Sequence, residues 1–310
     1  MKLPRILARK LGVGRMNYES EYRFDGSERL HLKNQATSLP SPVPDKDKIK
    51  AQLADNITKL ADLQSRLYAQ SSYGVVVLLQ GMDAAGKDSM IRHVMSGLDP
   101  EGTSVVSFKQ PTSNELAHDY LWRISSALPR RGSIQIFNRS QYEDVLISRV
   151  HPEILLGQHL PGINQLSDVT DDFFNQRFRD ITHYEEYLKH NGFIMVKFFL
   201  HYSRDEQKRR FEKRIEVPDK NWKFSAADIK ERAFWDDYQK AYEDMLNHTA
   251  TKENPWYIIP SDSKWNSRMV VSDILTTRLA ALKPEYPTVT DEQKQQLHEI
   301  LNHLQTDEKA

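Results

Sequence analysis

One glycine-rich stretch, residues 81–88 with the sequence GMDAAGKD, constrains this chain more than any other. It follows the apolar run 75–80 and precedes a segment with helical spacing of apolar residues. In a strand–loop–helix context, backbone N–H groups and the helix N-terminus converge on one phosphate, and the lysine adds a mobile positive charge. The residues expected to contact phosphate here are Gly81, Ala84, Ala85, Gly86, Lys87 and Asp88.

Two acidic residues make this loop irregular. Asp88 follows the lysine where a Ser or Thr usually holds magnesium, and Ser89 comes one place late. Asp83 lies inside the loop, where an anion would repel phosphate unless a cation lay between them. Asp83 is therefore a candidate magnesium ligand. The alternative is a surface turn that matches the pattern by chance, and the flanking strand and helix argue against it.

The composition excludes several classes of protein. A chain of 310 residues accommodates one large α/β domain with extensions, or two modest domains. The formal net charge is zero, so attraction to a polyanion must come from a local cluster of charge, and we expect neither nucleic acid nor membrane as a partner. There is no cysteine, which fits a reducing compartment, and we expect a cytoplasmic location. The apolar runs are too short to span a bilayer.

Both ends of the chain are expected to carry extensions. The first fifteen residues are basic without an acid, which suggests a transit peptide or, since a long apolar core is lacking, a basic N-terminal arm. After the proline-rich stretch 38–45, apolar spacing from Ile49 to Leu67 predicts an amphipathic helix. A second such helix over 292–304 can pack on the same chain or on a partner.

Between these extensions, short apolar runs alternate with helical patterns. Helices are expected to open at Thr112 and to cover 171–190. Five strands separated by helices, with near-continuous apolar character, predict an α/β fold with a five-stranded parallel sheet covered on both faces. Ligands of such sheets bind at the carboxyl ends of the strands. The five runs are 75–80, 104–108, 134–137, 193–200 and 256–259.

Charged residues follow the third of these runs. In a parallel sheet, Arg139 and the acids Glu143 and Asp144 would lie near the glycine loop. Arg139 can hold a phosphate through two parallel hydrogen bonds, and either acid can carry magnesium or orient an attacking oxygen. The alternative is an arginine that only pairs with neighbouring acids.

A basic cluster follows the fourth run. Residues 208–214 hold five bases and one acid. On a helix, Arg210 and Arg214 share one face, and Arg209 and Lys213 share another, so two cationic rows can lie along a chain of phosphates. The cluster is placed to close over the glycine loop as a lid. The alternative is a solvated helix face balanced by nearby acids.

Aromatic and histidine residues give weaker signals. Phe234, Tyr238 and Tyr242 recur every four residues and are expected to belong mostly to the core, although one aromatic can stack on a base. The histidines show no metal-binding spacing.

Taken in chain order, these motifs resemble the polyphosphate kinase 2 family. The resemblance rests on GMDAAGKD at 81–88, FNRS and YED between 137 and 144, the lid pairs at 210–215 with Trp222-Lys223, and PWY at 255–257 with Lys264-Trp265. It covers roughly residues 17 to 285. It implies a three-layer P-loop kinase fold with a helical lid, and transfer of a phosphoryl group between inorganic polyphosphate and a nucleotide with magnesium.

The resemblance also implies residue roles. Lys87 and Arg139 would hold the transferring phosphates, and Arg214 would reach them on lid closure. Glu143 and Asp144 look like the acidic pair of the branch that uses nucleoside monophosphates as well as diphosphates. The chain departs from the family at Asn138, where other branches have Asp, and at Gln141, where an aromatic is usual. The expected catalytic residues are Lys87, Arg139, Glu143, Asp144 and Arg214. The expected metal ligands are Asp83 and Asp144. The lid residues expected to bind phosphate are Lys208, Arg209, Arg210 and Lys213.

The sequence thus predicts a reversible, polyphosphate-dependent nucleotide kinase that acts on AMP, ADP or both, with GMP and GDP as further acceptors. Mg²⁺ is the expected cofactor, Mn²⁺ its substitute, and a homo-oligomer the expected assembly. The predicted domains are an N-terminal extension over 1–70, a kinase domain over 71–285 with its lid at about 204–235, and a C-terminal helix over 286–310. Two alternatives are an ATP-dependent nucleotide or small-molecule kinase of the same fold, and a non-catalytic P-loop module that binds polyanions such as RNA.

Overall fold

The sheet at the centre of the molecule carries all five predicted strands. The computed structural model describes residues 17–307, so the basic N-terminal arm lies outside the described residues. The five strands pair parallel to one another. They are β2 (Gly74–Gln80), β3 (Thr103–Ser107), β4 (Ile134–Asn138), β5 (Phe193–His201) and β6 (Trp256–Pro260).

A sixth strand corrects the prediction of a five-stranded, all-parallel sheet. Strand β1 (Arg23–Phe24) pairs antiparallel with β6, and the order across the sheet is β1-β6-β5-β2-β4-β3. This strand has two residues and no apolar alternation of its own, so only its pairing with β6 defines it.

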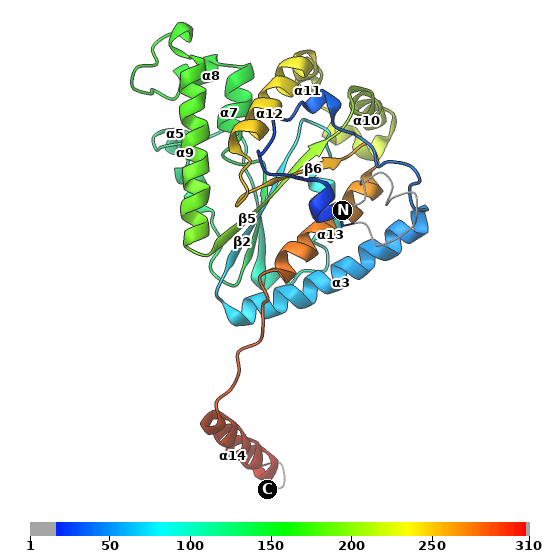
Figure 1. The fold of residues 1–310 in the computed structure, drawn as a ribbon, viewed down its shortest axis with the longest axis vertical. Helices are drawn as coiled ribbons and strands as arrows, with labels where there is room; N and C mark the ends of the chain where they lie inside the picture. Colours follow the sequence, from blue (N-terminus) through cyan, green and yellow to red (C-terminus); the bar gives the residue numbers. More distant parts are fainter. Residues whose placement is uncertain (1–16, 308–310) are drawn as a thin grey trace, which may run out of the picture.

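Helices cover both faces of the sheet, as predicted. One layer holds α3 (Lys46–Gln70), α4 (Lys87–Val94) and α13 (Lys264–Ala280), and the other holds α7 (Glu143–Val150), α9 (Asp171–His190) and α12 (Trp235–Thr249) (Figure 1). The remaining helices are α2 (Tyr18–Glu21), α5 (Ser113–Leu116), α6 (Trp122–Ser126), α8 (Glu153–Leu156), α10 (Arg204–Glu216), α11 (Ala226–Glu231) and α14 (Asp291–Asp307). Short 3-10 turns lie at Leu32–Asn34, Pro100–Gly102, Leu166–Asp168, Pro218–Lys223 and Arg232–Phe234.

Helix α3 belongs to the main hydrophobic core. Its apolar positions, among them Leu53 and Leu60, are buried in the same cluster as the strands. The buried Asn56 donates a hydrogen bond of 2.9 Å to Ser272 Oγ on α13, which fixes how the two helices pack. The N-terminal amphipathic helix therefore packs against the core, as its periodicity predicts.

The C-terminal helix stands apart from this body. Figure 1 shows α14 at the end of an extended segment, away from the sheet and its helices. Its four large apolar residues remain half exposed: Leu297 at 54%, Ile300 at 55%, Leu301 at 50% and Leu304 at 60%. Within residues 17–307, no helix is both long and apolar enough to cross a membrane.

Candidate active site

The glycine loop joins β2 to α4, which confirms the predicted strand–loop–helix unit. Gly86 caps the helix with φ +102° and Gly81 has φ +154°, conformations that side chains disfavour. Ala84 adopts φ +68° without the freedom of a glycine. The first residues of α4 line a pocket, and the N-terminus of a helix binds anions well.

Lys87 lies folded against this loop. It is only 9% exposed, and its Nζ donates hydrogen bonds to Gly81 O at 2.5 Å and to Met82 O at 3.4 Å. Burial lowers the pKa of Lys87, and the nearby Arg139 lowers it further, while Asp83 acts in the opposite direction. A phosphate anion beside Lys87 would favour its charged form, so the residue is suited to bind one.

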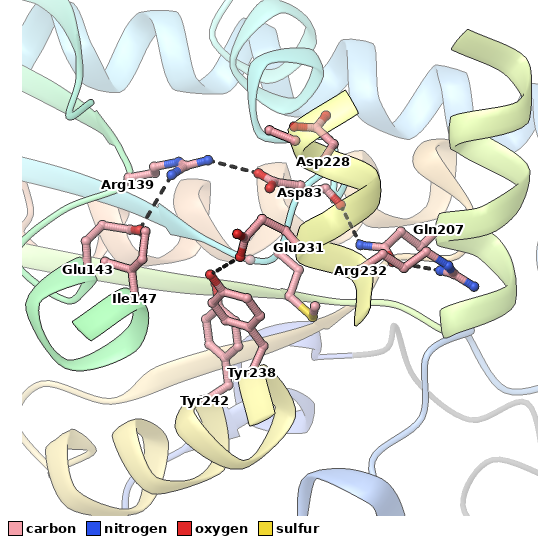
Figure 2. Close-up of a pocket in the computed structure, with 13 residues that line it drawn as sticks. Asp83, Arg139, Glu143, Ile147, Gln207, Asp228, Glu231, Arg232, Tyr238 and Tyr242 are labelled. Carbon is pink, nitrogen blue, oxygen red and sulfur yellow. Dashed lines mark hydrogen bonds and ion pairs between the residues drawn. The ribbon is translucent and has the colours of Figure 1, made fainter. Parts of the chain in front are cut away.

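Arg139 and Asp83 come together from two different elements. Arg139 follows β4, and its Nη2 donates a hydrogen bond of 2.9 Å to Asp83 Oδ1 in the glycine loop (Figure 2). Its Nη1 lies 3.6 Å from Glu143 Oε2. Glu143, and then Asp83, raise the pKa of Arg139, so the guanidinium stays charged. The predicted proximity of these residues is therefore observed.

A large basic pocket opens on one side of the Asp83–Arg139 pair. Its volume is about 450 Å³. Cations from the lid, the glycine loop helix and the end of β6 converge on it, which suits a long anion. We call it the basic pocket, and its lining consists of residues 83–89, Arg92, Asn138, Arg139, Arg209, Arg210, Lys213, Arg214, Lys220, Lys223 and Lys264.

A smaller pocket of about 260 Å³ adjoins the same pair (Figure 2). We call it the acidic pocket. It shares only Asp83 and Arg139 with the basic pocket, and its lining adds five apolar or aromatic side chains that can contact a nucleoside. The lining consists of Gly81, Met82, Asp83, Arg139, Glu143, Ile147, Gln207, Ala227, Asp228, Glu231, Arg232, Tyr238 and Tyr242.

Hydrogen bonds hold α11 over the acidic pocket. Glu231 accepts a bond of 2.8 Å from the Tyr238 hydroxyl and lies 3.0 Å from His151 Nε2. Arg232 donates to Gln207 Oε1 at 2.7 Å, which ties the lid segment to α10. Burial and the contact with Glu231 raise the pKa of Tyr238, so its hydroxyl stays protonated and acts as a donor.

The carboxylates of the acidic pocket fit a hard divalent cation. Among residues 17–307, no group of three or more His, Cys, Asp or Glu side chains forms a complete metal cage. Magnesium commonly uses one or two carboxylates together with substrate phosphates, so an incomplete protein set fits it. Burial, followed by the nearby Asp83, raises the pKa of Asp228, whereas Arg214, which donates to Asp228 Oδ2, lowers it.

Arg210 fastens the lid helix to the glycine loop. It is 5% exposed, and its Nη1 donates to Ala84 O at 2.8 Å and to Ala85 O at 2.7 Å. Its Nη2 donates to Ser261 O, and its Nε donates to Glu206 at 2.6 Å. Arg210 was predicted to bind phosphate directly. In the structure its donors bind carbonyls and a carboxylate, so Arg210 supports the shape of the glycine loop.

The other lid cations differ in whether they line the basic pocket. Arg209, Lys213 and Arg214 line the basic pocket, as the two predicted rows require. Lys208 is not among its lining residues; its side chain is 66% exposed and lies 3.8 Å from Glu212. Arg214 is held within the lid, because its Nη1 donates to Asp228 Oδ2 at 2.6 Å.

Asp144 departs from its predicted place beside Asp83. It is buried on another side of α7, where Arg177 Nη1 lies 3.3 Å from its Oδ1, and it lines a separate pocket. Successive helix residues point about 100° apart, so Glu143 and Asp144 cannot face one pocket. Burial raises the pKa of Asp144 against the opposing charge of Arg177. The structure therefore does not bring the two predicted metal ligands together.

Several site residues were absent from the predicted set. Lys264 follows the carboxyl end of β6, where ligand contacts are expected. The sequence could therefore have identified it as a site residue. Asp228 and Glu231 belong to a short helix with no distinctive pattern, and only the tertiary structure places them. The further additions to the two pockets are Met82, Ser89, Arg92, Asn138, Ile147, Gln207, Lys220, Lys223, Ala227, Arg232, Tyr238 and Tyr242.

Comparison with known sequences places this site among phosphotransferases. Residues 43–287 match the family profile described as "Polyphosphate kinase 2". An "ADP-polyphosphate phosphotransferase" of Rhodopseudomonas palustris is 43% identical over 284 residues, which cover 92% of this chain and 97% of that protein. An "AMP/ADP-polyphosphate phosphotransferase" of Meiothermus ruber is 43% identical over 229 residues, covering 74% of this chain and 80% of that protein.

A solved structure shares the fold over most of its length. The structure described as polyphosphate kinase 2 from Arthrobacter aurescens superposes with a TM-score of 0.83 at 32% identity. The superposition covers 93% of this chain and 97% of that one, so the similarity extends well beyond the nucleotide-binding core.

Proposed function

Because this chain belongs to the polyphosphate kinase 2 family, we propose that it transfers the terminal phosphoryl group of inorganic polyphosphate to a nucleotide, reversibly. AMP, ADP or both are the proposed acceptors, with GMP and GDP as further ones; relatives carry names that specify ADP, AMP/ADP and GDP. The observation that carries the proposal is that the basic and acidic pockets meet at Asp83 and Arg139.

Polyphosphate is assigned to the basic pocket. A linear polyanion needs cations spaced along its length, and this pocket presents lid cations opposite the glycine loop and Lys264. The terminal phosphate then lies at the loop, within reach of Lys87 and the helix N-terminus.

The acceptor nucleotide is assigned to the acidic pocket. Ile147 and Tyr238 offer apolar surface to the nucleoside, and Arg139 offers its guanidinium to the acceptor phosphate. Glu143, beside Arg139, orients that guanidinium. In this arrangement the acceptor and the donor approach each other from opposite sides of the Asp83–Arg139 pair.

Transfer requires one displacement at phosphorus. An oxygen of the acceptor's terminal phosphate forms a new P–O bond to the terminal phosphorus of polyphosphate. The bridging P–O bond breaks, and its electron pair leaves with the shortened chain. Both reactants are anions and neither needs a strong base, so positioning and charge neutralisation dominate the catalysis. Lys87, Arg139 and, on lid closure, Arg214 supply the positive charge.

Phosphoryl transferases generally depend on a divalent metal, and we propose Mg²⁺ here, with Mn²⁺ as a substitute. Asp83 would hold it together with phosphate oxygens, and the carboxylates of Glu143 and Asp228 lie in the same pocket. When bound, the ion neutralises phosphate charge at the junction of the two pockets.

One assay tests this function. Purified protein is incubated with polyphosphate and magnesium, with AMP, ADP, GMP and GDP in separate reactions, and products are separated by ion-exchange chromatography. We expect phosphorylated product from at least one adenine nucleotide. No product with any of the four would contradict the proposal.

Two further experiments, reactions with ATP and a non-nucleotide acceptor and a test of Lys87→Ala, separate the alternatives. An ATP-dependent kinase of this fold would phosphorylate a non-nucleotide acceptor from ATP with no contribution from polyphosphate. A non-catalytic polyanion-binding module would retain its function after Lys87→Ala. If the protein is a transferase, the Lys87→Ala variant would lose turnover and keep its fold.

We also propose a homo-oligomer and a cytoplasmic location. The oligomer is supported by the exposed apolar face of α14, for which a second copy offers an identical surface. The location is supported by the lack of cysteine, since the chain holds no disulfide of the kind that oxidising compartments favour.

A further inference from the structure

A buried contact joins the two segments that supply Asp83 and Arg139. Gln80 is the last residue of β2 before the glycine loop, and Ser140 directly follows Arg139. Both side chains are 0% exposed, and Gln80 Nε2 donates a hydrogen bond of 3.1 Å to Ser140 Oγ. The same Ser140 Oγ accepts a bond of 3.3 Å from Tyr142 N, at the entrance to α7.

The residue between these contacts has an unfavourable backbone conformation. Arg139 has φ +68°, in the left-handed region that residues with a side chain seldom adopt. Its backbone N–H is fixed by a bond of 3.2 Å to Leu79 O, one residue before Gln80. Arg139 adopts this conformation at the turn after β4, where its guanidinium contacts Asp83. Such strain persists only where the surrounding structure enforces it.

Gln80 itself carries a second local cost. Its Oε1 is buried without a hydrogen-bond partner, although an apolar side chain of similar size would avoid that cost. Stability alone therefore does not account for a glutamine at this position. Two unfavourable features at one junction, each bordering a proposed phosphate-binding segment, point to a positional requirement.

We propose that Gln80 and Ser140 are positioning residues for phosphoryl transfer: their buried hydrogen bond locks Arg139 in its left-handed conformation, with its guanidinium against Asp83. The bond ties the root of the glycine loop to the turn that precedes α7, so it also fixes where the two pockets meet. Neither residue lines either pocket, so both act through Arg139. The inference rests on the proposed function for its kinetic test.

The test compares Ser140→Ala, Gln80→Met and the double variant. Methionine keeps the length of glutamine and removes both amide atoms, so it also removes the unpaired Oε1. We expect each single change to lower kcat by roughly 10- to 100-fold, since small misplacements of a reacting group have effects of that size. The nucleotide KM should change less than about threefold, because the charge of Arg139 remains in the pocket. The double variant should be no slower than the slower single variant, which identifies one shared interaction.

Ser148→Ala is the matched control. Ser148 is 1% exposed on α7 and its hydroxyl donates to Asp144 O within that helix, so the same buried group is removed without touching the junction. We expect its kcat to stay within about twofold of the original. Equal kcat values for Ser140→Ala and Ser148→Ala, or multiplicative effects in the double variant, would overturn the inference.

A crystal structure of Ser140→Ala tests the inference without any turnover. We expect Arg139 to leave the left-handed region and its contact with Asp83, which is 2.9 Å in the intact protein, to lengthen or break. An unchanged Arg139 in that structure would refute the positioning role. An intact protein that shows no turnover would instead refute the proposed function, and the two failures are thus distinct.

Discussion

Charge at single residues decides what this site can bind. Lys87 lies at the start of α4 with its Nζ against backbone carbonyls, and Arg139 is held between two carboxylates. Lys87 is buried enough for its charge to act through a medium less polar than water, which strengthens its attraction for phosphate. The local balance of cations and carboxylates, more than the neutral net charge of the chain, sets the ligand.

Lys87→Ala removes the charge nearest the glycine loop. We expect kcat to fall about 100- to 1,000-fold, as when one stabilising donor is removed from a transition state. Circular dichroism and thermal unfolding should show that the fold is retained. Lys59→Ala, an exposed change on α3, is the control and should leave turnover intact. Full turnover of Lys87→Ala would exclude a catalytic role for this lysine.

Lys264 should make polyphosphate binding depend on pH. Burial, with help from Arg210 and Arg268, lowers its pKa to about 8. Its positive charge is present below that pH and is lost as the pH rises through it. We therefore expect the KM for polyphosphate to rise roughly fivefold between about pH 7 and about pH 9.

The control for this pH effect is Lys264→Arg, which stays charged over the whole range. Its KM should rise much less over the same interval, while titration of the substrates themselves affects both proteins equally. Parallel pH profiles for the two proteins would show that Lys264 does not contact polyphosphate.

At the scale of elements, helix α10 has two distinct functions. Its first turns anchor the lid through Arg210, which donates to carbonyls of the glycine loop and of the segment after β6. Its exposed rows then present cations to the basic pocket. A helix can do both because residues three and four apart share a face.

The two lysines of α10 test this division. Lys213→Ala should raise the KM for polyphosphate about 3- to 10-fold, because it removes one charged contact to the chain. Lys208→Ala makes the same charge change outside the pocket, and we expect an effect below about twofold. Steady-state kinetics with long-chain polyphosphate measure both. Equal effects would indicate that only the total charge of the lid matters.

At the scale of the whole molecule, the site and the core are contained well within the chain. The pockets draw on residues from Gly81 to Lys264, and the core cluster ends at Leu279. Helix α14 contributes to neither, and its apolar face is exposed. This exposed face is the surface through which the proposed homo-oligomer is expected to form.

Removing residues 288–310 separates assembly from activity. We expect kcat and KM to change by no more than about twofold. The unfolding temperature should change by no more than about 2 °C. Sedimentation velocity of the intact chain should show the predicted homo-oligomer, and the shortened chain should sediment as a smaller species. A monomeric intact chain would contradict the proposed assembly.

The sequence by itself determined the elements and the class of chemistry. Strands, helices and the 81–88 loop each follow from a pattern among residues that are close in the sequence. Such patterns can therefore be recognised without the structure. The predicted strands β2 to β6, helix α9 and the junction of Asp83 with Arg139 follow from such patterns and from where parallel strands end.

Only the tertiary structure decided which side chains meet. Asp144 and Glu143 are adjacent in sequence, yet the turn of α7 sends one to Arg177 and the other to the acidic pocket. Strand β1 exists only through its pairing with β6. Lys264 joins the basic pocket because Arg210 holds both the glycine loop and the segment after β6. These contacts depend on the packing of distant segments, and packing geometry is not encoded in any short stretch of residues.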